Sequence, residues 1–117
     1  MATKALQGPL YLHGGATGGT GNSGVAIWPG GMGVFSSEHT GGTVTLEYSG
    51  ADPATDTWIA AGPETTLAAS GAGAFYLPAK TRIRANGGAA TNIYSYVNQT
   101  GEYLFQWALS LRLSHDP

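Results

Sequence analysis

The sequence contains no cysteine, no long apolar run and few charged residues. Without cysteine, the chain has neither a disulfide framework nor a thiolate metal site. No stretch approaches the roughly 20 consecutive apolar residues of a membrane-spanning helix, and the first residues lack the apolar centre of a secretory signal. We therefore expect no membrane association. The length of 117 residues suits one domain.

Charge is scarce throughout the chain. Asp, Glu, Lys and Arg make up only 10% of the residues, against about 25% in an average soluble domain. The net charge of −2 provides no electrostatic surface for nucleic acid or anionic lipid. Hydrophobic residues reach 42%, enough to build a core, which argues against a disordered chain. The shortage of charge leaves two explanations open: a neutral, hydroxyl-rich surface, or a surface that faces other subunits.

Glycine dominates the beginning of the sequence. Between residues 13 and 24 it recurs about every second or third position, a spacing that disfavours helices and ordinary strands. We predict an extended, Gly-rich N-terminal arm over residues 1–24, followed by a β-domain over residues 25–117. Tyr11 and Leu12 are the bulky side chains near the middle of this arm, so they are candidate anchors for a partner. The first third of the chain is almost free of charge, and we expect it to meet the partners of the protein.

The remaining sequence alternates between apolar and polar residues in the manner of β-strands. Strands are predicted at residues 25–28, 33–37, 43–48, 57–60, 65–67, 75–77, 81–85, 92–97 and 102–113. Residues 70–73 and 98–101 are predicted as turns. A helix stays open for 102–113, because Leu, Ala, Gln and Arg are good helix formers. No connection is long enough for a helical crossover, so the predicted fold class is all-β, an antiparallel β-sandwich of jelly-roll-like or Ig-like type.

The catalytic and nucleotide-binding motifs that we sought are weak or absent. Residues 19–24 match the pattern G-x-G-x-x-G, but an apolar strand-like run follows where a helix would have to begin. No G-x-S-x-G nucleophile motif occurs, and several of the few carboxylates fall in predicted turns or on outward strand faces. We predict that the protein is not an enzyme and binds no cofactor.

Metal binding is also not predicted. The histidines, His13, His39 and His115, lie far apart, outside any metal-ligand spacing, and are expected to face solvent near loops or ends. Asp52 and Asp56 share one loop, but two carboxylates are few for calcium, which prefers six to eight oxygen ligands. Turn formation explains both aspartates better.

Aromatic residues are the most informative candidates for a binding surface. If Ile93 and Val97 face the core, Tyr94 and Tyr96 face outward on the same strand, where they could stack on sugars or form a subunit interface. Burial of both strand faces, or pairing with neighbouring strands, is the alternative. Trp28 is a further candidate for partner binding, and Trp58 joins it in a carbohydrate-binding interpretation.

A series of motifs between residues 43 and 97 carries a family resemblance. It consists of T-V-T-L-E-Y-S (43–49), D-T-W (56–58), T-L-A-A-S-G (66–71), F-Y-L-P-A (75–79), R-I-R-A (82–85) and Y-S-Y-V (94–97). The series resembles small virion proteins of tailed bacteriophages and covers roughly half the chain. The resemblance implies a β-sandwich subunit of a virion, and it supplies no set of functional residues to carry over.

The commonest role for such a protein is capsid decoration, as a cement protein that binds and stabilises the assembled head shell. The resemblance then implies a place on the capsid surface after synthesis in the host cytoplasm. The expected partners are the major capsid protein or other virion proteins, together with further copies of the chain, a trimer being favoured. A tail, head–tail adaptor or fibre component is the first alternative. A carbohydrate-binding β-sandwich module is the second.

Overall fold

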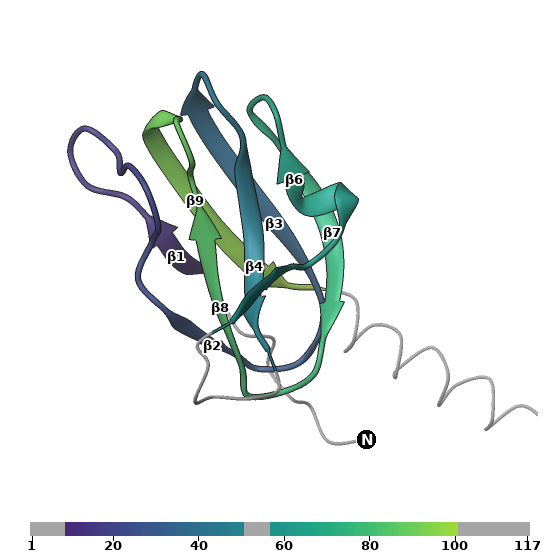
Figure 1. Ribbon diagram of the computed structural model, residues 1–117. Helices are drawn as coiled ribbons and strands as arrows, with labels where there is room; N and C mark the ends of the chain where they lie inside the picture. Colours follow the sequence, from purple (N-terminus) through teal and green to yellow (C-terminus); the bar gives the residue numbers. More distant parts are fainter. Residues whose placement is uncertain (1–8, 51–56, 101–117) are drawn as a thin grey trace, which may run out of the picture.

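The computed structural model describes residues 9–50 and 57–100, which form two antiparallel β-sheets packed face to face (Figure 1). The first sheet has the strand order β1-β9-β3-β7, and the second has the order β2-β8-β4-β5, with β6 also paired to β4. This arrangement confirms the predicted all-β sandwich. The elements are β1 (Leu10–His13), β2 (Ala26–Trp28), β3 (Gly31–Thr40), β4 (Val44–Ser49), β5 (Trp58–Ala60), a 3₁₀ turn η1 (Pro63–Thr65), β6 (Thr66–Leu67), β7 (Gly71–Leu77), β8 (Thr81–Asn86) and β9 (Thr91–Gln99).

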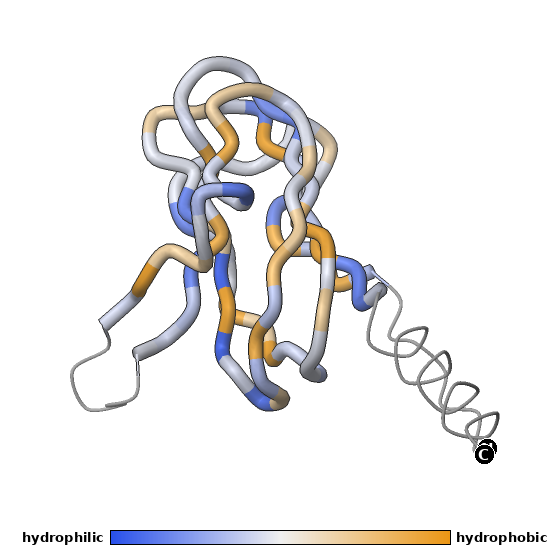
Figure 2. Tube along the Cα trace, turned by 90° about the vertical axis from the view of Figure 1, so that its right-hand side faces the viewer, coloured by the Kyte–Doolittle hydropathy of each residue, from blue (hydrophilic) through white to orange (hydrophobic). Residues whose placement is uncertain are grey.

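The core lies between the sheets and is filled by alternate side chains of the strands. Figure 2 shows hydrophobic positions interspersed with hydrophilic ones along the chain, as expected for strands with one buried face. Trp28 and Phe75 form an aromatic pair across the core, with ring centroids 4.8 Å apart and planes tilted by 53°. The other buried apolar residues are Phe35, Val44, Leu46, Leu77, Ile83, Ala85, Ala90, Ile93 and Val97.

Several strands, among them β3, are longer than the sequence predicted, and two of them extend into predicted turns. Residues 70–73 were predicted as a turn, but Gly71–Ala74 pair with β3 as the first half of β7. Residues 98–101 were also predicted as a turn, whereas Asn98 and Gln99 continue β9. The Gln99 Nε2 group donates to the Gly30 carbonyl at 2.7 Å, so a side chain assigned to a turn lies buried. In both places the pairing partner supplied hydrogen bonds that outweigh the local turn preference.

The predicted boundary at residue 24 is not where the sandwich begins. Leu10–His13 form strand β1, which pairs with β9 at the edge of the first sheet. The loop that follows is also attached, because Gly19 and Ile93 exchange two backbone hydrogen bonds of 2.7 and 3.0 Å. Ser23 N–H donates to the Ala85 carbonyl at 2.8 Å. Residues 9–24 therefore belong to the sandwich, and residues 1–8 of the predicted arm lie outside the described residues.

Glycine makes this loop possible by allowing left-handed backbone and close contact. Gly18 has a φ of 75°, and a Cβ placed there would lie 2.5 Å from the backbone carbon of Asn92. Only glycine can occupy such a position without strain. The glycines that argued against regular structure thus allow an irregular segment to lie directly against β9.

The predicted final strand at residues 102–113 lies outside the described residues. Its predicted hairpin partner, β9, is present, and it already has neighbours on both sides. β9 pairs with β1 along one edge and with β3 along the other. Among the described residues, the first sheet is therefore complete around β9.

Candidate functional site

The outer face of the first sheet carries an unusual concentration of tyrosine. Strand register places Tyr11 of β1 beside Tyr96 of β9, and Tyr96 beside Ser36 of β3. In the same way, Tyr76 of β7 lies beside Met32 of β3. We call this outer surface the tyrosine face. Its members are Tyr11, Met32, Val34, Ser36, Glu38, Ala72, Ala74, Tyr76, Tyr94, Tyr96 and Asn98.

The tyrosine face is exposed and almost without charge. Tyr11 is 74% exposed, Tyr76 66% and Tyr94 40%, and Glu38 is the one charged residue of the face among the residues described. The exposed parts of these tyrosines add up to nearly two complete side chains, or on the order of 300–450 Å² of amphipathic surface. Exposed tyrosine rings, apolar along the body and polar at the tip, are enriched at protein interfaces.

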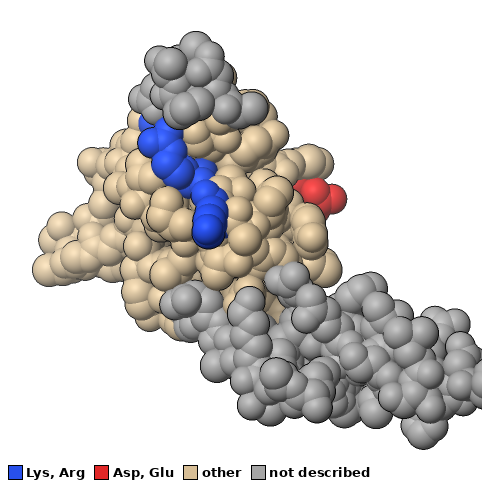
Figure 3. Space-filling view, turned by 90° about the horizontal axis from the view of Figure 1, so that it is seen from below, with Lys and Arg blue, Asp and Glu red and all other residues tan. Residues whose placement is uncertain are grey.

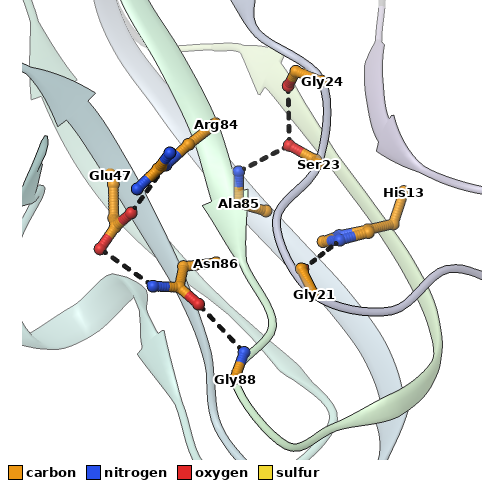
Figure 4. Close-up of polar contacts among 9 residues, drawn as sticks. All are labelled: His13, Gly21, Ser23, Gly24, Glu47, Arg84, Ala85, Asn86 and Gly88. Atoms are coloured by element: carbon orange, nitrogen blue, oxygen red, sulfur yellow. Dashed lines mark hydrogen bonds and ion pairs between the residues drawn. The ribbon is translucent and has the colours of Figure 1, made fainter. Parts of the chain in front are cut away.

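The outer face of the second sheet is built differently. Arg84 pairs with Glu47 at 3.0 Å and lies over the Trp58 ring, with its guanidinium carbon 4.3 Å from the ring centroid. Asn86 also donates to Glu47, at 3.4 Å (Figure 4). Seen from below in Figure 3, lysine and arginine form one stripe across this end of the molecule. Most described charges thus gather away from the tyrosine face.

A groove runs along the tyrosine face beside β1. It has a volume of about 470 Å³ and is lined by Tyr11, His13, Gly14, Gly15, Tyr94, Ser95 and Tyr96. The rings of Tyr11 and Tyr96 lie 5.9 Å apart and are tilted by 51°. The Tyr94 hydroxyl donates to the Ala16 carbonyl at 3.3 Å, which fixes the loop against the sheet. The groove thus has aromatic walls and a side formed by glycine backbone.

A buried histidine forms part of the base of the groove. The His13 N–H donates to Ser95 Oγ at 3.1 Å, and the same hydroxyl lies 2.8 Å from His13 Nδ1. Nε2 lies 2.9 Å from the Gly21 carbonyl (Figure 4). Because a carbonyl can only accept, Nε2 carries the proton, and in the neutral ring Nδ1 accepts from Ser95. His13 therefore joins β1, β9 and the glycine loop.

This serine–histidine contact is structural. Ser95 is 1% exposed and His13 is 5% exposed, so no substrate can reach the hydroxyl, and both ring nitrogens already have partners. The expectation that the histidines face solvent is wrong for His13. His39 is half-buried, and its Nδ1 lies 2.9 Å from Ser37 Oγ. His115 lies outside the described residues.

The structure brings together three of the five candidate residues for partner binding. Tyr11, Tyr94 and Tyr96 share the tyrosine face and the groove, as the alternation of β9 predicted for the last two. Leu12 lies at an irregularity of the β1–β9 register, half-buried and packed against the core. The prediction that Trp28 binds a partner is wrong, because this side chain is fully buried between the sheets.

Sequence reasoning missed Tyr76 and Met32, which extend the tyrosine face to its far edge. The signal was present in β7, where Phe75 and Leu77 are buried and Tyr76 between them points outward. The strand predicted at 75–77 was too short for this alternation to stand out, because β7 runs from Gly71 to Leu77. Trp58, the other tryptophan of the carbohydrate-binding interpretation, is half-buried beneath Arg84.

The described residues contain no cluster of three or more His, Asp or Glu side chains that could hold a metal ion. The loop with Asp52 and Asp56 lies outside this part of the chain. Over the same described ranges, no helix has the length and hydrophobicity needed to cross a membrane.

Comparison with known proteins assigns neither a family nor a function to the chain. The chain matches no protein-family model, no curated protein sequence and no solved structure. Any functional conclusion therefore depends on the tyrosine face, the groove and the sequence motifs themselves.

Proposed function

We propose that the protein is a non-enzymatic structural subunit that attaches to other proteins through the tyrosine face. The observation that carries this proposal is the segregation of the surface into an exposed, nearly uncharged tyrosine face and a charged opposite face. Tyrosine is enriched at protein interfaces, whereas Lys, Glu and Asp are depleted there.

The assembly that we propose is the head shell of a tailed bacteriophage, which the chain decorates as a cement protein. The motifs between residues 43 and 97 support this placement through their resemblance to small phage virion proteins. Low charge is consistent with it, because a subunit covered by neighbours needs little charge for solubility. The partners are the major capsid protein and further copies of the chain, with a trimer favoured.

The size of the tyrosine face fits repeated attachment better than one strong contact. A stable pairwise interface buries about 800 Å² on each partner, roughly twice the exposed tyrosine surface estimated above. A homo-oligomer on a symmetric shell makes several such contacts at once, so modest individual affinities produce firm attachment.

Copy number in purified virions tests the proposed placement. Quantitative mass spectrometry of particles of the phage that encodes the chain should find hundreds of copies per particle. A small fixed ring of copies would assign the chain to a tail, adaptor or fibre position. Its complete absence from particles would contradict the proposal.

Carbohydrate binding is the second candidate function, and the tyrosine-lined groove is the observation that favours it. Of the four aromatic residues behind this interpretation, only Tyr94 and Tyr96 still support it, because Trp28 is buried and Trp58 is covered by Arg84. Titration with a panel of soluble glycans, followed by amide chemical shifts, decides the matter. Shifts at Tyr94–Tyr96 would support a glycan site, and no shifts across the panel would end this interpretation.

A further inference from the structure

We propose that the groove beside β1 binds an extended, proline-containing peptide segment in the polyproline II conformation. The inference rests on the proposed function, because the groove belongs to the tyrosine face, and it specifies the chemistry of the protein partner there. Its basis is the combination of aromatic walls, missing charge and already bonded polar groups in one half-open groove.

The aromatic walls of the groove come from tyrosines of two neighbouring strands, β1 and β9. Tyr94 and Tyr96 project from the same face of β9, two residues and hence about 6.5–7 Å apart. Tyr11 stands 5.9 Å from Tyr96, measured between ring centroids. Centroids 5.9 Å apart belong to rings in contact, so the tyrosines form an aromatic surface on which the proline rings of an extended peptide can pack.

The absence of charged residues in the groove argues against acidic and basic ligands. None of the residues lining the groove is Asp, Glu, Lys or Arg. An ionic group entering the groove would lose hydration without gaining a partner of opposite charge, and such desolvation is costly. The occupant that complements this surface is therefore neutral.

The remaining polar groups favour a peptide over a sugar. His13 and Ser95 bond to each other and to the Gly21 carbonyl, and the Tyr94 hydroxyl bonds to Ala16. These groups are not available for the many hydroxyls of a glycan. A polyproline II segment needs fewer polar partners than a glycan. Its rings pack on aromatic side chains, and its unpaired carbonyls accept hydrogen bonds from tyrosine hydroxyls.

The glycine side of the groove leaves room for such a segment. A Cβ built on Gly14 or Gly15 would meet no atom within 4 Å. The groove is thus open next to the tyrosine walls, and an extended chain can enter and leave along it. A polyproline II helix advances about 3.1 Å per residue, so four residues span about 9 Å, which suits the short row of rings.

Titration of the full-length protein with a capped decaproline peptide tests the inference by amide chemical shifts. Saturable shifts confined to Gly14, Gly15 and Tyr94–Tyr96 are expected. Tyr11→Ser should raise the dissociation constant about tenfold or more, since one ring of the site is removed. Tyr76→Ser is the matched control, because Tyr76 is similarly exposed on the same face but lies outside the groove; it should leave the affinity unchanged.

Several outcomes would overturn the inference. They are the absence of shifts at millimolar decaproline, shifts with a chito-oligosaccharide but not with decaproline, and equal weakening by both tyrosine substitutions. A chain that ignores decaproline but still co-sediments with phage head shells would refute the peptide site and leave the proposed function standing. Decaproline binding without association to shells would support the peptide site and refute the proposed function.

Discussion

Replacing Ser95 with alanine should destabilise the fold strongly, although it removes a single oxygen atom. The hydroxyl accepts from the His13 N–H at 3.1 Å and donates to His13 Nδ1 over 2.8 Å. Both His13 groups would lose their partner in a site where the residue is only 5% exposed. Each buried polar group left unpaired costs about 1–3 kcal/mol, so for two groups we expect a loss of about 2–6 kcal/mol in the free energy of unfolding.

The assay is urea denaturation of the wild type, Ser95→Ala and Ser36→Ala, followed by far-ultraviolet circular dichroism. Ser36 is the matched control, because it lies half-buried on the outer face of neighbouring β3, and its substitution should change the stability by less than about 0.5 kcal/mol. In thermal unfolding, the melting temperature of Ser95→Ala should fall by roughly 10 °C or more. Equal stability of the two variants would refute the view that His13 anchors β1 and the glycine loop.

Two further substitutions test close contacts elsewhere in the sandwich. In Gly33→Ala the new methyl carbon would lie 2.5 Å from the Trp28 ring, and overpacking should cost about 1–3 kcal/mol or more. Gly24→Ala, which meets no atom within 4 Å, is its control in thermal unfolding, and equal melting temperatures would contradict the packing. Arg84→Ala loses an ion pair at 3.0 Å and the contact with Trp58, so urea denaturation at low salt should show a loss of about 0.5–1.5 kcal/mol. An unchanged midpoint would mean that these surface contacts contribute nothing.

Much of the fold could be predicted because alternation reports which strand face is buried. Val44 and Leu46 in β4 and Ile93 and Val97 in β9 point into the core, as their spacing indicated. The same logic placed Tyr94 and Tyr96 outside. Prediction failed where long-range pairing decides the structure. Residues 71–74 join β7 only because β3 lies beside them, and no local pattern reveals that neighbour.

The beginning of the chain shows a second limit of sequence reasoning. Glycine content predicted an arm up to residue 24, yet residues 10–13 form β1. Compositional arguments cannot see the hydrogen bonds that His13 makes across 82 residues to Ser95. Deleting residues 1–12 would therefore remove most of strand β1.

The candidate site was predictable in part. Exposed aromatic residues on an alternating strand were recognised, and they define the centre of the tyrosine face. Trp28 was misplaced because its short strand gives no clear alternation, and a tryptophan before Pro29 fits either a surface turn or a core. Its Nε1–H donates to the Gly31 carbonyl at 3.2 Å, which satisfies the polar atom and permits complete burial.

The most direct test of the proposed attachment is co-sedimentation of the chain with assembled head shells of the tailed phage from which we propose that it comes. The account predicts saturable binding that the double variant Tyr11→Ser/Tyr76→Ser weakens about tenfold or more. Ile27→Ser, at a 55% exposed apolar position on the outer face of the second sheet, should bind as the wild type does. Wild-type binding by the double variant, or loss of binding in Ile27→Ser alone, would contradict attachment through the tyrosine face.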